Sequence, residues 1–301
     1  MPAVTIGSHR AKGARATSLG GSAVRVAAFG LLAVAALSSL GCINVSSGAE
    51  KVDPAAFTWN APVSAPATVF VRSMNGPVEV KPATDGNVSV TAAVRWRRGD
   101  PKRDLRFEAV PGANGPTICA LWGGGTCSAS RYHSSGSGLP SRLFGHGTDA
   151  NVTFTVFVPT GVKVDIVTVN GSIGVAATAP VTARTVNGTI KIATAVGPVD
   201  AETVNGNVDV RMTTLGADGP VRARSVNGSA SAYLPEKFDG AVELSTVLGG
   251  ITSDFAGGAL SDGNKKFVAT LGSGGRVIDV GTVTGSAALH KLKADGSVAA
   301  P

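Results

Sequence analysis

Thr168-Val169-Asn170-Gly171 is a four-residue stretch that returns as Thr185-Val186-Asn187-Gly188 and as Thr203-Val204-Asn205-Gly206. Ser225-Val226-Asn227-Gly228 is a conservative variant, and Ser73-Met74-Asn75-Gly76 is an early copy. The asparagines from Asn170 onward are 17, 18 and 22 residues apart. A period near 20 residues is typical of a stacked repeat, in which each unit buries its apolar face only against its neighbours.

Two architectures use strand–turn–strand units of this kind. Asn-Gly between β-rich runs also favours a hairpin. The charges favour a parallel stack, because aligning the copies at Asn-Gly puts Arg184, Glu202 and Arg224 in one column of alternating sign. Asp200, Arg222 and Glu243 form a second such column. In-register parallel neighbours lie about 4.8 Å apart, where opposite charges stabilise and like charges do not.

The predicted fold class is therefore all-β, a parallel β-solenoid (β-helix) of roughly 17–22-residue coils with an N-terminal antiparallel elaboration. The interior columns hold small or β-branched residues such as Ala183, Ala201 and Ala223, which suit a narrow core. Degenerate copies at Thr246-Val247-Leu248-Gly249 and Thr282-Val283-Thr284-Gly285 are expected to continue the stack with a different turn.

The Asn-Gly positions are interpreted as structural. Asparagine tolerates the left-handed conformation, stacked asparagine side chains can bond from rung to rung, and glycine suits the bend. The Thr or Ser hydroxyl before each Val-Asn-Gly is expected to satisfy backbone groups at the turn. The turn residues assigned in this way are Asn75, Asn170, Asn187, Asn205, Asn227, Gly171, Gly188, Gly206 and Gly228.

The first 42 residues have the composition of an export signal. Positive residues precede an apolar run, Val26–Leu37, which is shorter than the roughly 20 residues of a membrane span. The run leads into Ser39-Leu40-Gly41-Cys42, which resembles a lipoprotein processing box although Ser39 and Leu40 depart from its preferred residues. Lipidation of Cys42 is the prediction, and the alternatives are an ordinary secretory signal or an uncleaved anchor.

The rest of the chain divides by composition. We predict a linker at 43–64, an N-terminal β region with the first coil, a cap and a disulfide loop at 65–160, the solenoid repeat at 161–290 and a tail at 291–301.

The charge balance is mild after the signal. The whole chain is +7, and four positive residues precede Cys42, which leaves +3 for the exported part. This is too little to argue for a nucleic-acid partner.

Cys119 and Cys127 predict a disulfide in an oxidising compartment. His133 and His146 follow them and raise a zinc alternative, but their spacing matches no ordinary zinc finger. No metal and no cofactor is predicted.

The coils, the strand with Cys119 and the segments Thr270–Gly275 and Gly281–Ser286 resemble the DUF4097 family of adhesin-like bacterial envelope proteins. The resemblance covers roughly residues 65–290. It implies a β-solenoid that is exported or lipid-anchored, with an adhesin role, and it brings no catalytic motif.

Two classes of function remain. The first is a non-enzymatic envelope protein, held at a membrane through Cys42, that acts as a binding, adhesion or structural scaffold for an unidentified envelope protein or polysaccharide. Its binding face would use Arg184, Glu202, Arg222 and Arg224, together with an exposed stripe of Val186, Val204 and Val226 unless a bulge turns these valines inward.

The second is a polysaccharide lyase or hydrolase, which needs paired carboxyl groups such as Asp200, Glu202 and Asp209. Each of these carboxylates faces an Arg or Lys column, which suits a structural ion pair better. The expectation is therefore that the chain is not an enzyme.

Overall fold

The computed structural model describes residues 49–134, 147–177, 180–194, 196–216 and 219–293. The regular structure of this part of the chain is almost entirely β-strand, and its one helix, α1 (Pro101–Asp104), is a single turn. No helix within it is long and apolar enough to span a membrane. The strands form two large sheets, called sheet A and sheet B, and a small ribbon of β7 (Thr126–Cys127) and β8 (Tyr132–His133).

Sheet A has ten strands. Their order in space is β1 (Lys51–Pro62), β4 (Asn87–Trp96), β9 (Asn151–Val158), β3 (Val78–Pro82), β11 (Ile173–Ala177), β13 (Ile190–Thr194), β15 (Val208–Met212), β17 (Ala230–Pro235), β23 (Ala287–Leu292) and β19 (Ile251–Ser253). The pairs β1–β4 and β4–β9 are antiparallel, and every pair from β9 to β19 is parallel.

Sheet B has eleven strands. Their order is β20 (Ala259–Ser261), β21 (Lys266–Leu271), β18 (Gly240–Leu248), β22 (Val277–Thr284), β16 (Val221–Asn227), β14 (Val199–Asn205), β12 (Val181–Asn187), β10 (Lys163–Val167), β2 (Thr68–Arg72), β6 (Thr117–Trp122) and β5 (Leu105–Val110). The eight strands from β18 to β6 pair in parallel, and antiparallel strands flank them at both ends.

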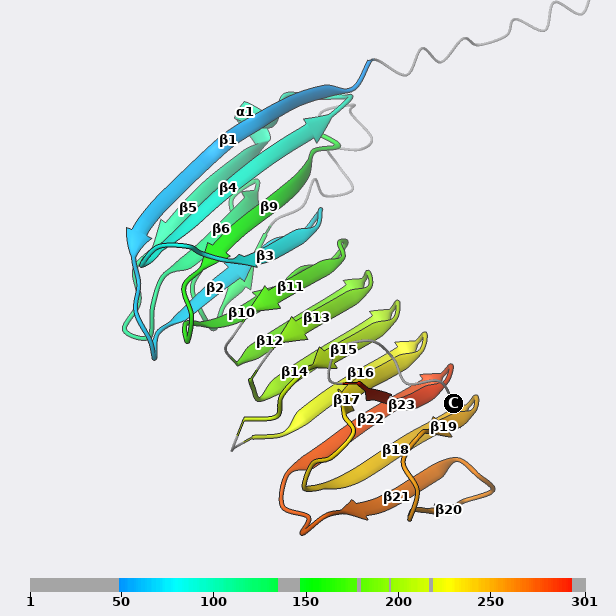
Figure 1. Ribbon diagram of the computed structural model, residues 1–301. Helices are drawn as coiled ribbons and strands as arrows, with labels where there is room; N and C mark the ends of the chain where they lie inside the picture. Colours follow the sequence, from blue (N-terminus) through cyan, green and yellow to red (C-terminus); the bar gives the residue numbers. More distant parts are fainter. Residues whose placement is uncertain (1–48, 135–146, 178–179, 195, 217–218, 294–301) are drawn as a thin grey trace, which may run out of the picture. The chain divides into compact units, whose positions relative to one another are not determined.

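Each repeat unit gives one strand to each sheet, as β12 and β13 do on the two sides of Asn187-Gly188 (Figure 1). We call such a pair of strands a coil. Neighbouring coils pair in register, with Arg184 beside Glu202 and Lys191 beside Asp209. The fold is thus all-β with mixed sheets. The antiparallel strands β1, β4 and β5 agree with the expected N-terminal elaboration, whereas the antiparallel strands β21 and β20 at the other end of sheet B were not predicted. These antiparallel strands cover parallel edges that would otherwise expose unpaired backbone groups.

The core lies between the inward faces of the two sheets. Strands of period two bury alternate residues, and β12 buries Val181, Ala183 and Thr185 while Thr182 and Arg184 point outward. The largest fully buried side chains include Ile190, Ile192 and Leu244. Small and β-branched side chains fill this space because each needs to reach only halfway across a narrow core.

The coil order near the C-terminus corrects the sequence prediction. The coil of β18 and β19 was expected directly after that of β16 and β17, but β22 and β23 lie between them in both sheets. Arg222 therefore neighbours Asp279 instead of Glu243, and Glu243 neighbours Asp279 and pairs with Lys266 of β21 at 3.0 Å. Asp279 gives Arg222 an opposite charge just as Glu243 would, so the column pattern alone could not distinguish the two orders.

Two predicted boundaries are also wrong. The expected linker 43–64 contains β1, which pairs with β4 because Phe57 and Trp59 are half-buried and pack against the core. The expected tail begins too early, because β23 runs to Leu292, which is 3% exposed. The signal segment 1–42 with Cys42, and residues 294–301, lie outside the described residues.

A candidate binding face on sheet B

The turn between the two strands of a coil is held by three kinds of hydrogen bond. Each asparagine amide bonds to the asparagine of the preceding coil, from Asn170 to Asn75 at 2.8 Å, Asn187 to Asn170 at 2.8 Å, Asn205 to Asn187 at 2.8 Å and Asn227 to Asn205 at 2.9 Å. From Thr168 onward each Thr or Ser hydroxyl donates to a glycine carbonyl of a neighbouring coil, as Thr203 does to Gly188 at 3.0 Å, whereas the buried hydroxyl of Ser73 in the early copy has no partner among the described residues. The glycine amides donate to the next asparagine carbonyl, as Gly188 does to Asn205 at 2.9 Å.

The late coils keep this turn although they lack asparagine. Gly285 has φ +142°, close to the +147° of Gly228, and its amide donates to Leu248 O at 2.9 Å. Thr282 and Thr246 still donate to glycine carbonyls, at 2.7 and 2.9 Å. The expectation of a different turn is therefore wrong, because the hydroxyl and the glycine define the bend and the asparagine only adds a rung-to-rung bond.

The repeat also lays out the outer face of sheet B in three columns. Positions five, three and one residues before the asparagine point outward on β12, β14, β16, β22 and β18. The first column holds Thr182, Asp200, Arg222, Asp279 and Glu243. The middle column holds Arg184, Glu202, Arg224, Gly281 and Ser245. The valine column holds Val186, Val204, Val226, Val283 and Val247.

The valine column is exposed rather than turned inward by a bulge. Val186, Val204 and Val226 are 39–40% exposed, Val283 is 42% and Val247 is 61%. Together with the middle column, Val204, Val226, Val283 and Val247 line a shallow groove of about 620 Å³, and Val186 lies beside it. Five β-branched residues in one line on an outer face form a contiguous apolar strip, which is different from the scattered single valines of an ordinary surface.

Arg184 and Arg224 anchor the charges beside this strip. Arg184 bonds to both Asp200 and Glu202, the latter at 3.2 Å, and Arg224 bonds to Asp279. The hydrogen bond to Asp279 raises the pKa of Arg224 above its ordinary value. The chemical character of the groove is therefore an apolar strip along a row of fixed, alternating charges.

Arg222 lies in the first column between Asp200 and Asp279 and does not line the groove. Among the described residues no carboxylate oxygen lies within 4.0 Å of its guanidinium nitrogens, although Asp200 and Asp279 stand on the two adjacent strands.

Sequence reasoning missed Asp279 and Gly281 as members of this face. Both sit at the expected distances before the degenerate Thr282-Val283-Thr284-Gly285 copy, so the alignment could have found them if that coil had been placed beside Asn227. Gly281 has no side chain between Arg224 and Ser245, and this leaves a gap in the middle column that the Ser245 hydroxyl, 3.0 Å from the Cβ position of Gly281, partly fills.

No known protein family matches this chain, and no curated protein sequence matches it. Solved structures that are similar in fold include the following two. One is a proposed cell adhesion protein from Clostridium sporogenes, with 11% identity and a TM-score of 0.43 over 80% of this chain and 97% of that one. The other is a proposed adhesin from Bacteroides fragilis, with 9% identity and a TM-score of 0.35 over 79% and 97%. Both likenesses are distant, and neither identifies what this chain binds.

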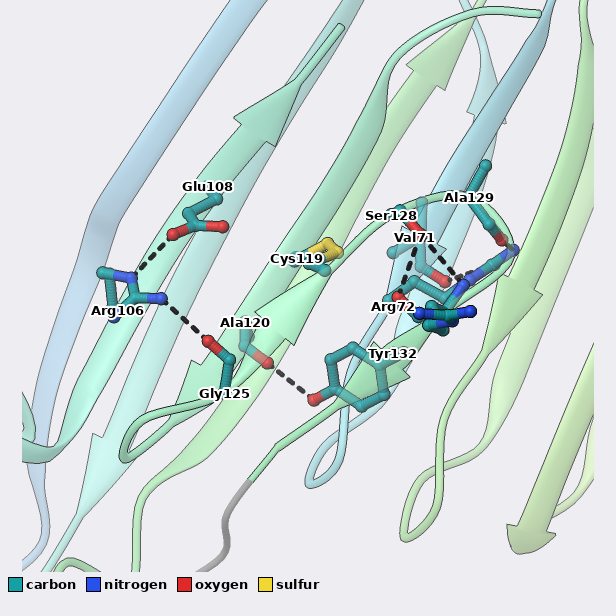
Figure 2. Close-up of a disulfide and its surroundings, with 12 residues drawn as sticks. Val71, Arg72, Arg106, Glu108, Cys119, Ala120, Gly125, Ser128, Ala129 and Tyr132 are labelled. Carbon is teal, nitrogen blue, oxygen red and sulfur yellow. Dashed lines mark hydrogen bonds and ion pairs between the residues drawn. A yellow bond between two sulfur atoms is a disulfide. The ribbon is translucent and has the colours of Figure 1, made fainter. Parts of the chain in front are cut away.

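A flap of β7 and β8 limits the face at its N-terminal end (Figure 2). Cys119 of β6 and Cys127 of β7 form the predicted disulfide, with Cα atoms 6.5 Å apart. The hydroxyl of Tyr132 donates to Ala120 O at 2.7 Å, and burial raises the pKa of Tyr132 to about 12. The bridge ties the flap to the sheet and removes both sulfurs as ligands for the zinc alternative.

Arg72 occupies the middle-column position of β2 beneath this flap. It is 5% exposed, donates to Ala129 O at 2.7 Å and pairs with Asp165 at 2.8 Å. Burial lowers its pKa, and the Asp165 carboxylate opposes that shift. The middle column is therefore exposed to solvent at Arg184 and covered by the flap at Arg72.

The carboxylates considered for polysaccharide cleavage do not meet. Asp200 and Glu202 are both held by Arg184 on sheet B, whereas Asp209 points outward from β15 on sheet A, across the core. Among the described residues no group of three His, Cys, Asp or Glu side chains could hold a metal ion. His146 lies outside those residues.

Proposed function

We propose that this chain is a non-enzymatic protein of the bacterial cell envelope, a β-solenoid that binds a partner through the outer face of sheet B. The observation that carries the proposal is the strip of five exposed valines beside alternating charges. Exposed apolar strips rimmed by polar residues mark interaction sites. The hydrogen-bonded turns support a binding role further, because a rigid face loses little entropy when it binds.

The envelope location is part of the proposal. The signal-like segment ending at Cys42 favours export, and the Cys119–Cys127 disulfide suits an oxidising compartment. A lipid at Cys42 would hold the protein at a membrane, and the partner would be an envelope protein or a polysaccharide.

Site-specific photo-cross-linking in the producing cell tests the binding face. A photoreactive residue at Val204 or Val226 should give cross-linked adducts on illumination. The same residue at Val52 is a matched control, because Val52 is 52% exposed but lies on edge strand β1. Adducts at the two face positions and few at Val52 would support the proposal. No adducts at Val204 and Val226 would show that this face contacts no partner, and equal adducts at all three positions would show that contacts are not specific to this face.

A further inference from the structure

The charge order of the face is complementary to itself. This inference rests on the proposed function and names its partner. We propose that the outer face of sheet B binds the same face of a second copy of the chain. The two copies would be related by a twofold axis that runs parallel to the strands, between β14 and β16. Such an axis keeps each residue's position along its strand and reverses the order of the strands, so each column faces itself with the coils inverted.

The charged columns match under this operation. β14 faces β16 of the second copy, so Glu202 lies over the partner's Arg224, and Asp200 lies over the partner's Arg222. The symmetry repeats both contacts, which gives four facing pairs of opposite charge. Arg222 has no ion pair among the described residues of its own chain, and in the dimer it would lie over the carboxylate of the partner's Asp200.

The next pair of strands matches in shape. β12 faces β22, so Arg184 lies over the partner's Gly281, where the middle column has its gap. The Arg184 side chain is 44% exposed and can enter that gap, next to the carboxylate of the partner's Asp279. In the valine column Val204 covers the partner's Val226, and Val186 covers the partner's Val283. The apolar strips therefore lie face to face.

An axis between β12 and β14 would also bring opposite charges together, Arg184 over the partner's Glu202 and Asp165 over the partner's Arg222, but it places β2, where the flap of β7 and β8 covers Arg72, over the partner's β22. The remaining positions of the axis match less well. An axis through β14 would place Arg184 over the partner's Arg224, and Glu202 over its own copy. An axis through β16 would place Arg222 on its own copy, and Asp200 over the partner's Asp279. Moving the axis between β16 and β22 would bring Asp200 over the partner's Glu243. Like charges meet close to the axis in each of these last three arrangements, and they would disfavour them. In the proposed arrangement like charges meet only at the margin, where β10 faces β18 and Asp165 lies over the partner's Glu243. Each of these two carboxylates is paired in its own chain, Asp165 with Arg72 and Glu243 with Lys266.

The size of the face sets the expected strength. Four strands of the face, β12, β14, β16 and β22, lie over one another; with a spacing of about 4.8 Å and columns that span about 13 Å along the strands, they give a footprint of roughly 250 Å² for each copy. A standard stable interface buries about 800 Å² on each partner. The pairing should therefore be reversible and depend on concentration, as suits contacts between proteins on apposed surfaces.

A charge-swap experiment on the full-length chain tests the pairing. Glu202→Arg places two cations together across the axis, and Arg224→Glu places two carboxylates together, so each variant alone should dimerise at least about tenfold more weakly than wild type. Mixed in equal amounts, the two variants face each other with opposite charges at both contacts, and dimerisation should return. Sedimentation equilibrium over a concentration series measures all three samples. Lys191→Glu on sheet A is the control and should dimerise like wild type.

The outcomes separate this inference from the proposed function. Circular dichroism first establishes that each variant is folded, and restored dimerisation in the mixture would itself show intact faces. A wild-type chain that stays monomeric throughout the series, or a mixture that dimerises no better than its components, would overturn the twofold pairing. If Val204 then still gave photo-cross-linked adducts to another species, the binding face would stand with a different partner. If it gave none, both would fall.

Discussion

At the scale of single residues, each residue of Thr-Val-Asn-Gly has a separate role in the turn. The hydroxyl satisfies a neighbouring carbonyl, the valine points out, the asparagine bonds from rung to rung, and the glycine lets two backbones approach. Gly206 shows why no other residue fits: its φ is +150°, and an added Cβ would lie 2.1 Å from Gly188 O. The nearest atoms are all backbone atoms of Gly188 and Thr189, so no flexible side chain could move away to relieve the clash.

Gly206→Ala should therefore destabilise the protein by about 2–4 kcal/mol, because strain at a positive φ adds to a backbone clash. Gly86→Ala is the matched control, because Gly86 has no atom within 4 Å of its Cβ position and should change stability by less than about 1 kcal/mol. Urea unfolding measures both. Equal midpoints for the two variants would show that the repeat glycines are not needed for close approach.

The sequence predicted these residue roles well, because the signals are local. The alternation of Val181, Ala183 and Thr185 assigns inward positions, and Asn-Gly assigns the bend. The roles of Asp279 and Gly281 could not be predicted in the same way. They depend on which coil lies beside β16. Either Asp279 or Glu243 would place a carboxylate next to Arg222, so the charges do not show which coil it is.

At the scale of elements, the chain inserts its last coil into the stack instead of adding it to the end. β22 lies between β16 and β18, and β23 lies between β17 and β19, so both strands are central in their sheets. The same device occurs near the N-terminus, where β2 lies between β6 and β10. Repeat spacing cannot reveal such insertions, because the intervening segments 77–162 and 236–276 hold strands of their own.

Truncation tests the central position of the last coil. A chain that ends at Arg276 loses Ile278, Val280 and Leu289, which are fully buried, and it separates β18 from β16. Losing a whole buried coil should abolish cooperative unfolding or lower the melting temperature by more than about 10 °C. A chain that ends at Lys293 keeps β23 whole and should melt like the full chain. Thermal unfolding followed by circular dichroism makes the comparison, and similar melting of both truncations would place the last coil at a dispensable edge.

At the scale of the whole molecule, the two sheet faces offer different surfaces to a partner. Sheet B presents the valine column and the alternating charges, and the flap of β7 and β8 closes that face at one end. A lipid at Cys42 would restrict the protein to the membrane surface and raise its local concentration, which favours a weak, reversible pairing.

Cys42→Ser tests the anchor. If a lipid is attached there, the variant should move from the membrane fraction to the soluble fraction, or accumulate as unprocessed precursor, because a buried acyl chain supplies the membrane affinity. Cell fractionation and gel mobility measure both. A variant that fractionates and migrates like wild type would contradict lipidation at this residue.

The strand order β12–β14–β16–β22–β18 assembles the binding face, and cysteine pairs report it directly. In the order described here Val226 and Val283 lie on adjacent strands, about 4.8 Å apart at Cα, and Val226 and Val247 lie two strands apart, about 9.6 Å. A disulfide spans Cα distances of about 4.4–6.8 Å. Under mild copper oxidation, a chain with Val226→Cys and Val283→Cys should cross-link, whereas a chain with Val226→Cys and Val247→Cys should not. Cross-linking of the second chain and not the first would mean that the coils stack in sequence order, and it would contradict the face on which the proposed binding depends.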